Sequence, residues 1–379
     1  MYVCAFWFVT LVMDHSFRSK SKMVLSLFMF VAFLLYLGHL MFFTKAVELY
    51  AFYDSIYQFA SLSVYPLFFL YILSLTEKPT LRHWFFLLFP PFLIAFITVI
   101  LDLLMGSKEL IAFVKQELYQ EQGVFVFSPL GEMRRITLEL SKGFFLLQIL
   151  CVVYGGTRRI VQHEKMVKNY YSNMEGKTLS SIRILLIVFV VTSLCSITVK
   201  LIGRSYFIQS ELVLAFPSLV FSTLLYLLGF FGSKQSFSAQ DFAQDIVAVD
   251  DLTETAQIDE FHDEIQFEEI KDRLLDLLEN KEYYRQKDLR LSDVSVLLGT
   301  NRSYISRVVN QKLHTSFCDL VNKYRIEHAK KLIRQSRESA LPLGEIAEAS
   351  GFSGESSFYR VFKKEIGVSP GSWRESNSF

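Results

Sequence analysis

Long apolar runs, separated by short polar segments, dominate the chain from its start to Gly232. A helix needs about 20 mostly apolar residues to cross a lipid bilayer. The runs that meet this length with at most one charged residue each are residues 23–44, 53–75, 84–105 and 212–232. Two further runs, 138–156 and 181–203, carry charges near their ends, where long side chains reach the headgroups. The pattern therefore predicts six membrane-spanning helices.

The apolar run at residues 2–13 is shorter than the others and has the length of a signal-peptide core. However, it lacks a basic leader and a small-residue cleavage site, and the basic residues Arg18, Lys20 and Lys22 follow it. We therefore interpret this run as a first span with a short outer end. This interpretation brings the prediction to about seven spans.

The distribution of basic residues predicts the orientation of these spans. If the region after residue 232 is cytoplasmic, the inner loops are residues 14–22, 76–83 and 157–180. These loops contain 10 Lys or Arg, whereas the outer loops, although longer in total, contain only 6. This bias has the sign of the positive-inside rule. It predicts a multi-pass membrane protein whose C-terminal part lies in the cytoplasm.

The outer loop at residues 106–137 is the longest loop between the predicted spans, and it is amphipathic. We therefore expect an external signal to bind there. Few ionisable residues lie deep inside the spans, and such residues are functional candidates. His39 is one of them, and both a structural and a sensing role stay open for it. Paired carboxylates at matching positions of two halves, which would indicate an ion-coupled transporter, do not occur.

An acidic segment, residues 233–265, separates the apolar half from the rest of the chain. Residues 235–264 contain nine Asp or Glu and no Lys or Arg, and apolar residues such as Phe237 and Phe242 interrupt them. Two interpretations stay open. The segment is either a tether kept away from DNA and anionic lipid by its own charge, or a short amphipathic helix that passes the state of the bundle downstream.

Residues 291–309 have the pattern of a helix-turn-helix unit. Ser292 is a suitable N-cap, and Gly299 can take the left-handed conformation that ends the first helix. Asn301 then caps a second helix over residues 302–311, which in such a unit enters the major groove of DNA. We expect the buried face of the first helix to consist of Val294, Val296, Leu297 and Leu298.

A long helix is predicted over residues 317–335, and the helix-turn-helix pattern repeats after it. Pro342 lies in the first turn of a helix that Gly351 ends, and a second reading helix starts near Gly354. One such pattern is a weak signal, because many helical hairpins resemble it. Two phased copies joined by one long helix are a much stronger indication of a DNA-binding domain.

The composition divides the chain into residues 1–232, 233–265 and 266–379. Apolar residues make up 51% and charged residues 20% of the chain, below the roughly 25% charge of average soluble domains. The four cysteines form no CxxC pair, and the sequence contains no metal-ligand spacing, phosphate loop or nucleophile with a nearby base. We therefore expect no enzyme activity, no metal site and no cofactor.

Two segments of the C-terminal region carry family-specific motifs. Residues 351–374, GFSGESSFYRVFKKEIGVSPGSWR, and residues 322–333, NKYRIEHAKKLI, resemble the signature and the linker helix of AraC-type transcription regulators. The resemblance covers residues 267–379 and implies a domain with two DNA-reading helices. The soluble β-barrel that usually binds the effector in this family is absent from the pattern. The chain is similar instead to the membrane-anchored AraC-like proteins of some Gram-negative bacteria. This resemblance implies a location in the bacterial inner membrane.

The resemblance assigns DNA-binding roles, by position, to residues that we expect on the outer faces of the two reading helices. The readers are Ser303, Tyr304 and Arg307 in the first helix, and Glu355, Ser356, Ser357, Tyr359 and Arg360 in the second; Lys363 and Lys364 are expected to contact phosphates. The two arginines serve either guanine edges or phosphates, and Glu355 either accepts from a cytosine or stabilises the positive end of its helix. Residues 285–379 contain 16 Lys or Arg and 10 Asp or Glu, the sign needed to bind DNA.

Together these features predict an all-α protein, with a polytopic transmembrane bundle followed by a cytoplasmic double helix-turn-helix domain. The predicted function is sequence-specific transcription regulation from the membrane. The expected partners are double-stranded DNA, the lipid bilayer, a second copy of the chain and an unidentified signal molecule or protein. The resemblance favours activation and dimerisation. The alternatives are a membrane receptor or transporter with a regulatory helical tail, and a membrane enzyme with a DNA-binding tail.

Overall fold

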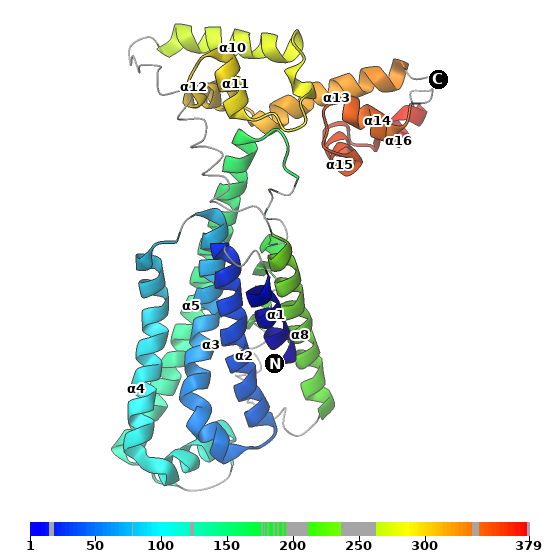
Figure 1. Ribbon diagram of the computed structural model, residues 1–379. Coiled ribbons are helices and arrows are strands. Elements are labelled where there is room, and N and C mark those ends of the chain that lie inside the picture. The colour runs from blue at the N-terminus through cyan, green and yellow to red at the C-terminus, as the bar shows by residue number, and fades with distance from the viewer. Residues whose placement is uncertain are drawn as a thin grey trace. The chain divides into compact units, whose positions relative to one another are not determined.

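The protein is helical throughout the part of the chain that its computed structural model describes (Figure 1). The described residues are 1–14, 19–77, 79–121, 125–175, 177, 179, 182–184, 186, 187, 189–191, 193, 194, 211–235, 263–335 and 341–376. The chain divides into two compact units. The apolar unit comprises Met1–Val161 and Leu179–Gln240, and the second unit comprises Gln162–Thr178 and Asp241–Phe379. The predicted all-α class is confirmed.

Helices of the apolar unit pack side by side. They are α1 (Tyr2–Met13), α2 (Lys20–Phe43), α3 (Val47–Thr76), α4 (Leu81–Phe113) with the π-helical turn η1 (Val114–Leu118), the first part of α5 (Pro129–Tyr170), and α8 (Glu211–Lys234). By length and composition, four of the described helices could cross a membrane: Lys20–Phe43, Val47–Thr76, Leu81–Leu118 and Pro129–Tyr170. Tyr2–Met13, Ile182–Val191 and Ser218–Lys234 are apolar but shorter. The described residues thus contain four membrane-length helices, and the structure does not show seven.

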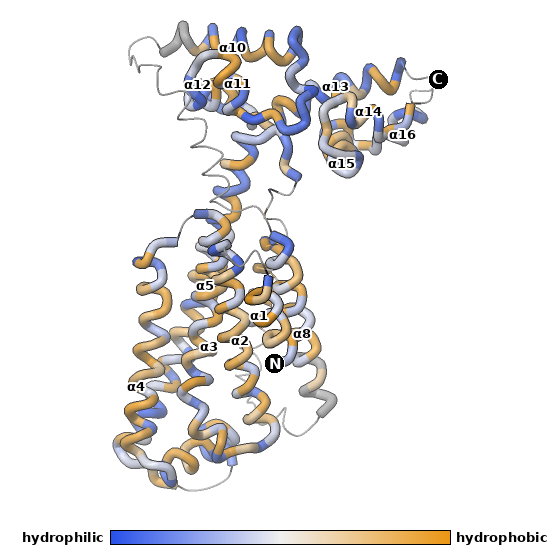
Figure 2. Tube along the Cα trace, viewed as in Figure 1, coloured by the Kyte–Doolittle hydropathy of each residue, from blue (hydrophilic) through white to orange (hydrophobic). Residues whose placement is uncertain are grey.

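Helix α3 is the central helix of the apolar unit, and α4 and α5 lie on its outside. In the most apolar window of α3, 89% of the residues are buried, against 22% for α4 and 28% for α5. The surface of α4 consists of large apolar side chains: Leu81, Phe85, Phe86, Phe92, Phe96, Leu103 and Leu104 are each more than half exposed. Hydrophobic residues accordingly colour most of this unit in Figure 2. Soluble proteins rarely expose so continuous an apolar surface.

Helix α5 is longer than the predicted span at residues 138–156, because its 42 residues run on through a region that we expected to be a loop. The predicted span ends with Gly155 and Gly156. In the structure they lie inside the helix, where a Cβ atom at each would come within 3.0 Å of the Phe69 ring and of Ile72, respectively. The glycines therefore allow close helix packing. Beyond them, the last residues of α5 belong to the second unit.

The second unit contains the C-terminal helices. They are α10 (Asp263–Glu279), the 3-10 turn η2 (Tyr283–Arg285), α11 (Leu291–Leu298), α12 (Arg302–Arg307), the π-helical turn η3 (Val308–Lys312), α13 (Phe317–Gln335), α14 (Leu343–Ala349), α15 (Glu355–Ile366) and α16 (Pro370–Ser376). The predicted acidic tether or helix falls almost entirely on residues 236–262, outside the described residues. The same holds for the later part of the predicted span 181–203, from residue 195 onward.

Candidate nucleic-acid interface

The first helix-turn-helix unit consists of α11, a tight turn and α12. Gly299 ends α11 with φ = 60°, and the Asn301 side chain accepts a hydrogen bond from the Ser303 amide (2.9 Å), as predicted. Helix α12 then continues as η3, and Ile305, Val308 and Val309 are buried at 0–1% exposure. The turn and the buried face thus fix the direction of the predicted reading helix.

Helix α11 differs from the prediction at its start and on one face. It begins at Leu291, and the Asp293 carboxylate caps its start by accepting a hydrogen bond from the Arg290 amide (2.7 Å). Ser292 therefore lies inside the helix, and its prediction as the N-cap is wrong. Val296 and Leu297 are 54% and 43% exposed, so they do not belong to the buried face. The buried face of α11 instead consists of Leu291, Val294 and Leu298, which recur at helical spacing, together with Ser292 and Ser295.

The predicted readers of the first unit differ in exposure. Ser303 and Arg307 are exposed on α12. Tyr304 is half-buried, and its ring lies 5.8 Å from the ring of Phe267 on α10. Tyr304 therefore helps to hold α12 against α10, whatever it contributes to DNA contact.

The second helix-turn-helix unit is built on an aromatic core. Phe358 and Phe362 of α15 are fully buried, and Trp373 of α16 packs edge-on against Phe362 with 5.9 Å between ring centroids. Gly351 follows α14 with φ = 87°, and a Cβ atom there would lie 2.6 Å from the Tyr284 carbonyl oxygen. Only glycine fits this position, because both its backbone conformation and its contact exclude a side chain.

Most of the predicted readers in the second unit face outward. Glu355, Ser356 and Arg360 are exposed, and Tyr359 is half-buried. Ser357 is only 6% exposed, and its hydroxyl donates to the Gly354 carbonyl (2.7 Å). The expectation that Ser357 lies on the outer face is therefore wrong. Its position next to the buried Phe358 gives it a role in closing the start of α15.

The two predicted phosphate-contacting lysines have different surroundings. Lys363 is exposed, whereas Lys364 Nζ lies 2.8 Å from Asp319 Oδ1 and 3.6 Å from Glu365 Oε1. Burial alone would raise the pKa of Asp319, but hydrogen bonds from Lys364 and Ser316 outweigh it and lower that pKa. Part of the charge of Lys364 is therefore already balanced within the domain.

Arg325, which the sequence reasoning did not single out, is the main buried polar residue of the second unit. It lies on α13, the helix that joins the two helix-turn-helix units, and is 1% exposed. Its guanidinium donates to the Tyr284 carbonyl (2.8 Å) and the Gln286 carbonyl (2.7 Å). Burial lowers its pKa to about 10. Arg325 thereby ties the loop before α11 to the joining helix.

The described geometry agrees with comparisons to known proteins. A family model described as a helix-turn-helix domain matches residues 294–376. The C-terminal region is 33% identical over 101 residues to the HTH-type transcriptional regulator GlxA of Rhizobium meliloti, covering 27% of this chain and 30% of that protein. It is 30% identical over 95 residues to YisR of Bacillus subtilis, an uncharacterized HTH-type transcriptional regulator, covering 25% and 32%. Residues 294–376 form an AraC-type helix-turn-helix domain.

The AraC-type domain is also similar to a solved structure, the C-terminal domain of AraT, a response regulator from Geobacillus stearothermophilus. The identity is 32%, the match covers 29% of this chain and 84% of that chain, and the TM-score is 0.25. The chain spans about a third of the length of the two curated relatives above. The helix-turn-helix match describes residues 294–376 and not the rest of the chain. Among the described residues, no group of three or more His, Cys, Asp or Glu could hold a metal ion.

The apolar unit contains a buried ion cluster that the sequence reasoning missed. Arg134, near the start of α5, is 0% exposed and forms ion pairs with Asp54 of α3 and with Asp102 of α4 (2.8 Å to Asp102). Asp102 is the one charged residue of the predicted span 84–105, and Arg134 was assigned to the predicted outer loop at residues 106–137. The cluster connects three helices through charges that are costly to bury unless they are paired.

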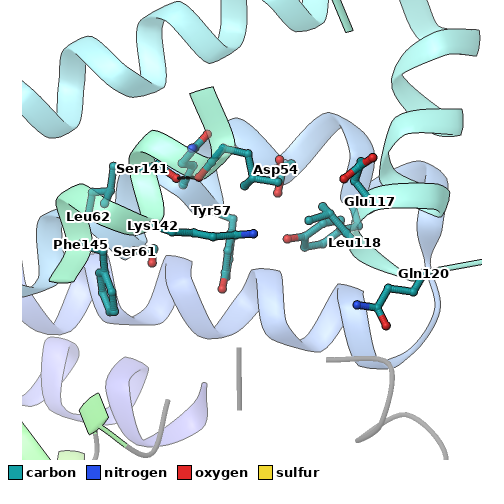
Figure 3. Close-up of a pocket in the computed structure, with 13 residues that line it drawn as sticks. Asp54, Tyr57, Ser61, Leu62, Glu117, Leu118, Gln120, Ser141, Lys142 and Phe145 are labelled. Atoms are coloured by element: carbon teal, nitrogen blue, oxygen red, sulfur yellow. Dashed lines mark hydrogen bonds between the residues drawn. The ribbon is translucent and has the colours of Figure 1, made fainter. Parts of the chain in front are cut away.

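A polar cavity of about 110 Å³ lies beside this cluster and is lined by α3, α5 and the segment around η1 (Figure 3). Lys142 extends across it toward the side where Glu117 and Leu118 lie. Gln58 also lines it, and its amide nitrogen Nε2 is buried without a hydrogen-bond partner among the described residues, while its Oε1 accepts from Thr98 (2.8 Å). A buried donor without a partner is costly, and a polar ligand or water would satisfy it.

Proposed function

We propose that the protein is a membrane-bound, sequence-specific transcription regulator that couples an envelope or external signal to promoter binding. The observation that carries this proposal is the presence, in one chain, of an AraC-type domain and four helices of membrane-spanning length. The alternative is a membrane receptor or transporter with a regulatory helical tail. The AraC-type domain favours the regulator, because a helix-turn-helix unit places a helix in the major groove of DNA and this domain has two such units.

Membrane insertion is supported by the outer surface of the apolar unit. The exposed phenylalanines and leucines of α4 would be unstable in water, whereas lipid provides an apolar environment for them. We propose a multi-pass protein of the bacterial inner membrane, with about seven spans and a cytoplasmic C-terminal domain. The positive-inside bias of the loops supports this orientation.

DNA recognition is proposed for the exposed residues of the two reading helices. Ser303 and Arg307 would contact one major groove, and Glu355, Ser356 and Arg360 the next, about 34 Å away. Tyr304, Tyr359 and Ser357 would support these residues from half-buried or buried positions, and Lys363 would contact phosphate. A homodimer that activates transcription is the form that we propose for the active protein.

Signal sensing is proposed for the polar cavity in the apolar unit. Glu117, Leu118 and Gln120 come from the region predicted to be an outer loop, so the cavity contains part of the segment expected to meet an external signal. The unpartnered Gln58 amide supports the binding of a small polar ligand. Replacing Gln58 by leucine should remove this donor, so that promoter occupancy no longer changes between growth conditions that alter wild-type occupancy. If promoter occupancy of Gln58→Leu still changes between these growth conditions as in the wild type, the cavity is not the signal-binding site.

The decisive experiment is genome-wide occupancy of the full-length, tagged protein, compared with the variant Arg307→Ala/Arg360→Ala. We expect discrete sites with a two-part motif, which the variant loses because each arginine serves one reading helix. The matched control is Lys323→Ala/Lys331→Ala, which removes two exposed charges from α13 and should keep the sites. Diffuse binding that neither variant changes would favour the receptor or transporter instead.

A further inference from the structure

The residues that follow the body of α5 form part of the second unit. Residues 170–175, which we call the strap, run along the loop that precedes α11. Tyr171 forms an antiparallel β-bridge with Arg290, and the Ser172 amide donates to the Leu289 carbonyl (3.1 Å). Tyr171 and Ser172 are 2% and 1% exposed. Most of the strap is therefore buried, and it belongs to the same unit as the AraC-type domain, although the two segments of the bridge lie far apart in the sequence.

The joining helix α13 binds the strap through Arg325. The guanidinium donates to the Ser172 hydroxyl (3.2 Å) and lies 3.4 Å from the Ser172 carbonyl, which also accepts from Cys318 Sγ (3.4 Å). A buried guanidinium needs hydrogen-bond acceptors, because burying it without them is costly. The strap supplies two of these acceptors, and the loop before α11 supplies the others. Arg325 thus connects the strap to both segments.

The strap also contacts both helix-turn-helix units. The Tyr170 hydroxyl lies 3.1 Å from the Ser292 hydroxyl of α11, and its ring faces the guanidinium of Arg302, the first residue of α12, at 5.8 Å. Glu175 accepts a hydrogen bond from Ser353 (2.5 Å), two residues before α15 begins. One short segment therefore contacts the starts of both predicted reading helices, which is where such helices meet base edges.

We propose that the strap, and not the acidic segment, carries the state of the apolar unit to the two reading helices. This inference rests on the proposed function. Helix α5 begins in the apolar unit and ends in the strap without a break, so a shift or rotation of α5 moves the strap directly. Since the two reading helices must match successive major grooves, a small change in their relative orientation weakens DNA binding.

Docking of the strap is tested by a disulfide in the full-length protein in membranes. In a background with Cys4, Cys151 and Cys195 replaced by alanine, Ser172→Cys should form an intramolecular disulfide with the native Cys318 on mild oxidation. A protease site inserted in the acidic segment separates the two cysteines, so the disulfide keeps the cleaved fragments together until reduction. Lys165→Cys, an exposed position earlier on α5, is the control and should give separate fragments. If Ser172→Cys also gives separate fragments, the strap does not dock and the inference is wrong.

Signal transmission is tested by promoter occupancy of three full-length variants. Tyr170→Ala/Glu175→Ala should change occupancy by about tenfold, within the usual range of coupling between sites. Promoter occupancy should stay close to that of the wild type in two controls. One is Lys165→Ala, and the other replaces residues 241–258 by a Gly/Ser segment of the same length. If the strap variant behaves like wild type, or if the Gly/Ser replacement has the larger effect, the inference fails while the proposed function stands. If wild-type protein itself occupies no discrete sites, the proposed function fails, and transmission through the strap fails with it.

Discussion

Replacing Arg325 by methionine should lower the free energy of unfolding of the second unit by about 3 kcal/mol. The two closest hydrogen bonds, to the carbonyls of Tyr284 and Gln286, would be lost, and the Tyr284 carbonyl would stay buried. An unsatisfied buried acceptor costs about 1–3 kcal/mol, and a lost hydrogen bond to a charged group costs about 1.5–3 kcal/mol, which together give about 2.5–6 kcal/mol. Part of this cost is offset, because the charge of the guanidinium no longer has to be buried. A net loss of about 3 kcal/mol in the stability of the second unit raises the population of molecules in which this unit is open about a hundredfold.

The assay for this prediction is maleimide labelling of Cys318 in membranes. Cys318 is 5% exposed, and burial raises the pKa of its thiol to about 11, so it reacts only when the unit opens. With the other cysteines replaced, the labelling rate follows the open population. Lys323→Met, which changes an exposed residue of the same helix, should label at the wild-type rate. If Arg325→Met labels within about threefold of wild type, the buried guanidinium does not stabilise the unit and our reasoning is wrong.

Two further predictions concern the AraC-type domain. Gly351→Ala should destabilise it by about 2–5 kcal/mol. The left-handed conformation costs about 1–2 kcal/mol, and overpacking against the Tyr284 carbonyl costs about 1–3 kcal/mol. Thermal unfolding, followed by the loss of DNA binding, measures this effect, and an unchanged unfolding midpoint would contradict it. Asp319 has a lowered pKa, so its contribution is complete above the ordinary Asp pKa of about 4 and is lost as the pH falls through the folded-state pKa. Between pH 5 and 3 the wild type should therefore lose more stability than Asp319→Asn, and parallel curves would show that the pair with Lys364 contributes nothing.

The AraC-type domain could be predicted closely from sequence because its signals are local. Gly299 and Asn301 act within one turn of the chain, and their roles as helix end and cap are confirmed. Predictions that depend on the exact phase of a short helix were less accurate. Val296 and Leu297 lie between buried positions of an eight-residue helix, and a rotation of one residue decides which of them is covered.

Features that depend on tertiary contacts could not be predicted from the sequence. Arg134 lies 80 residues from Asp54 and 32 from Asp102, and no local pattern pairs them. The strap could not be predicted from the sequence for a related reason. Gly155 and Gly156, followed by basic residues, indicate the end of a span, and only the contacts with α3 show that the glycines serve close packing instead. Helix α5 then continues, since neither proline nor glycine occurs between residues 157 and 170.

The chain passes between its two units three times, at residues 161/162, 178/179 and 240/241. The first of these connections lies inside the continuous helix α5. Each turn of an α-helix is hydrogen-bonded to the next, so a displacement or rotation at one end of α5 is carried along its axis. In our proposal, the orientation of the reading helices is therefore controlled through α5. This continuity is the physical reason to look for the signal in the strap.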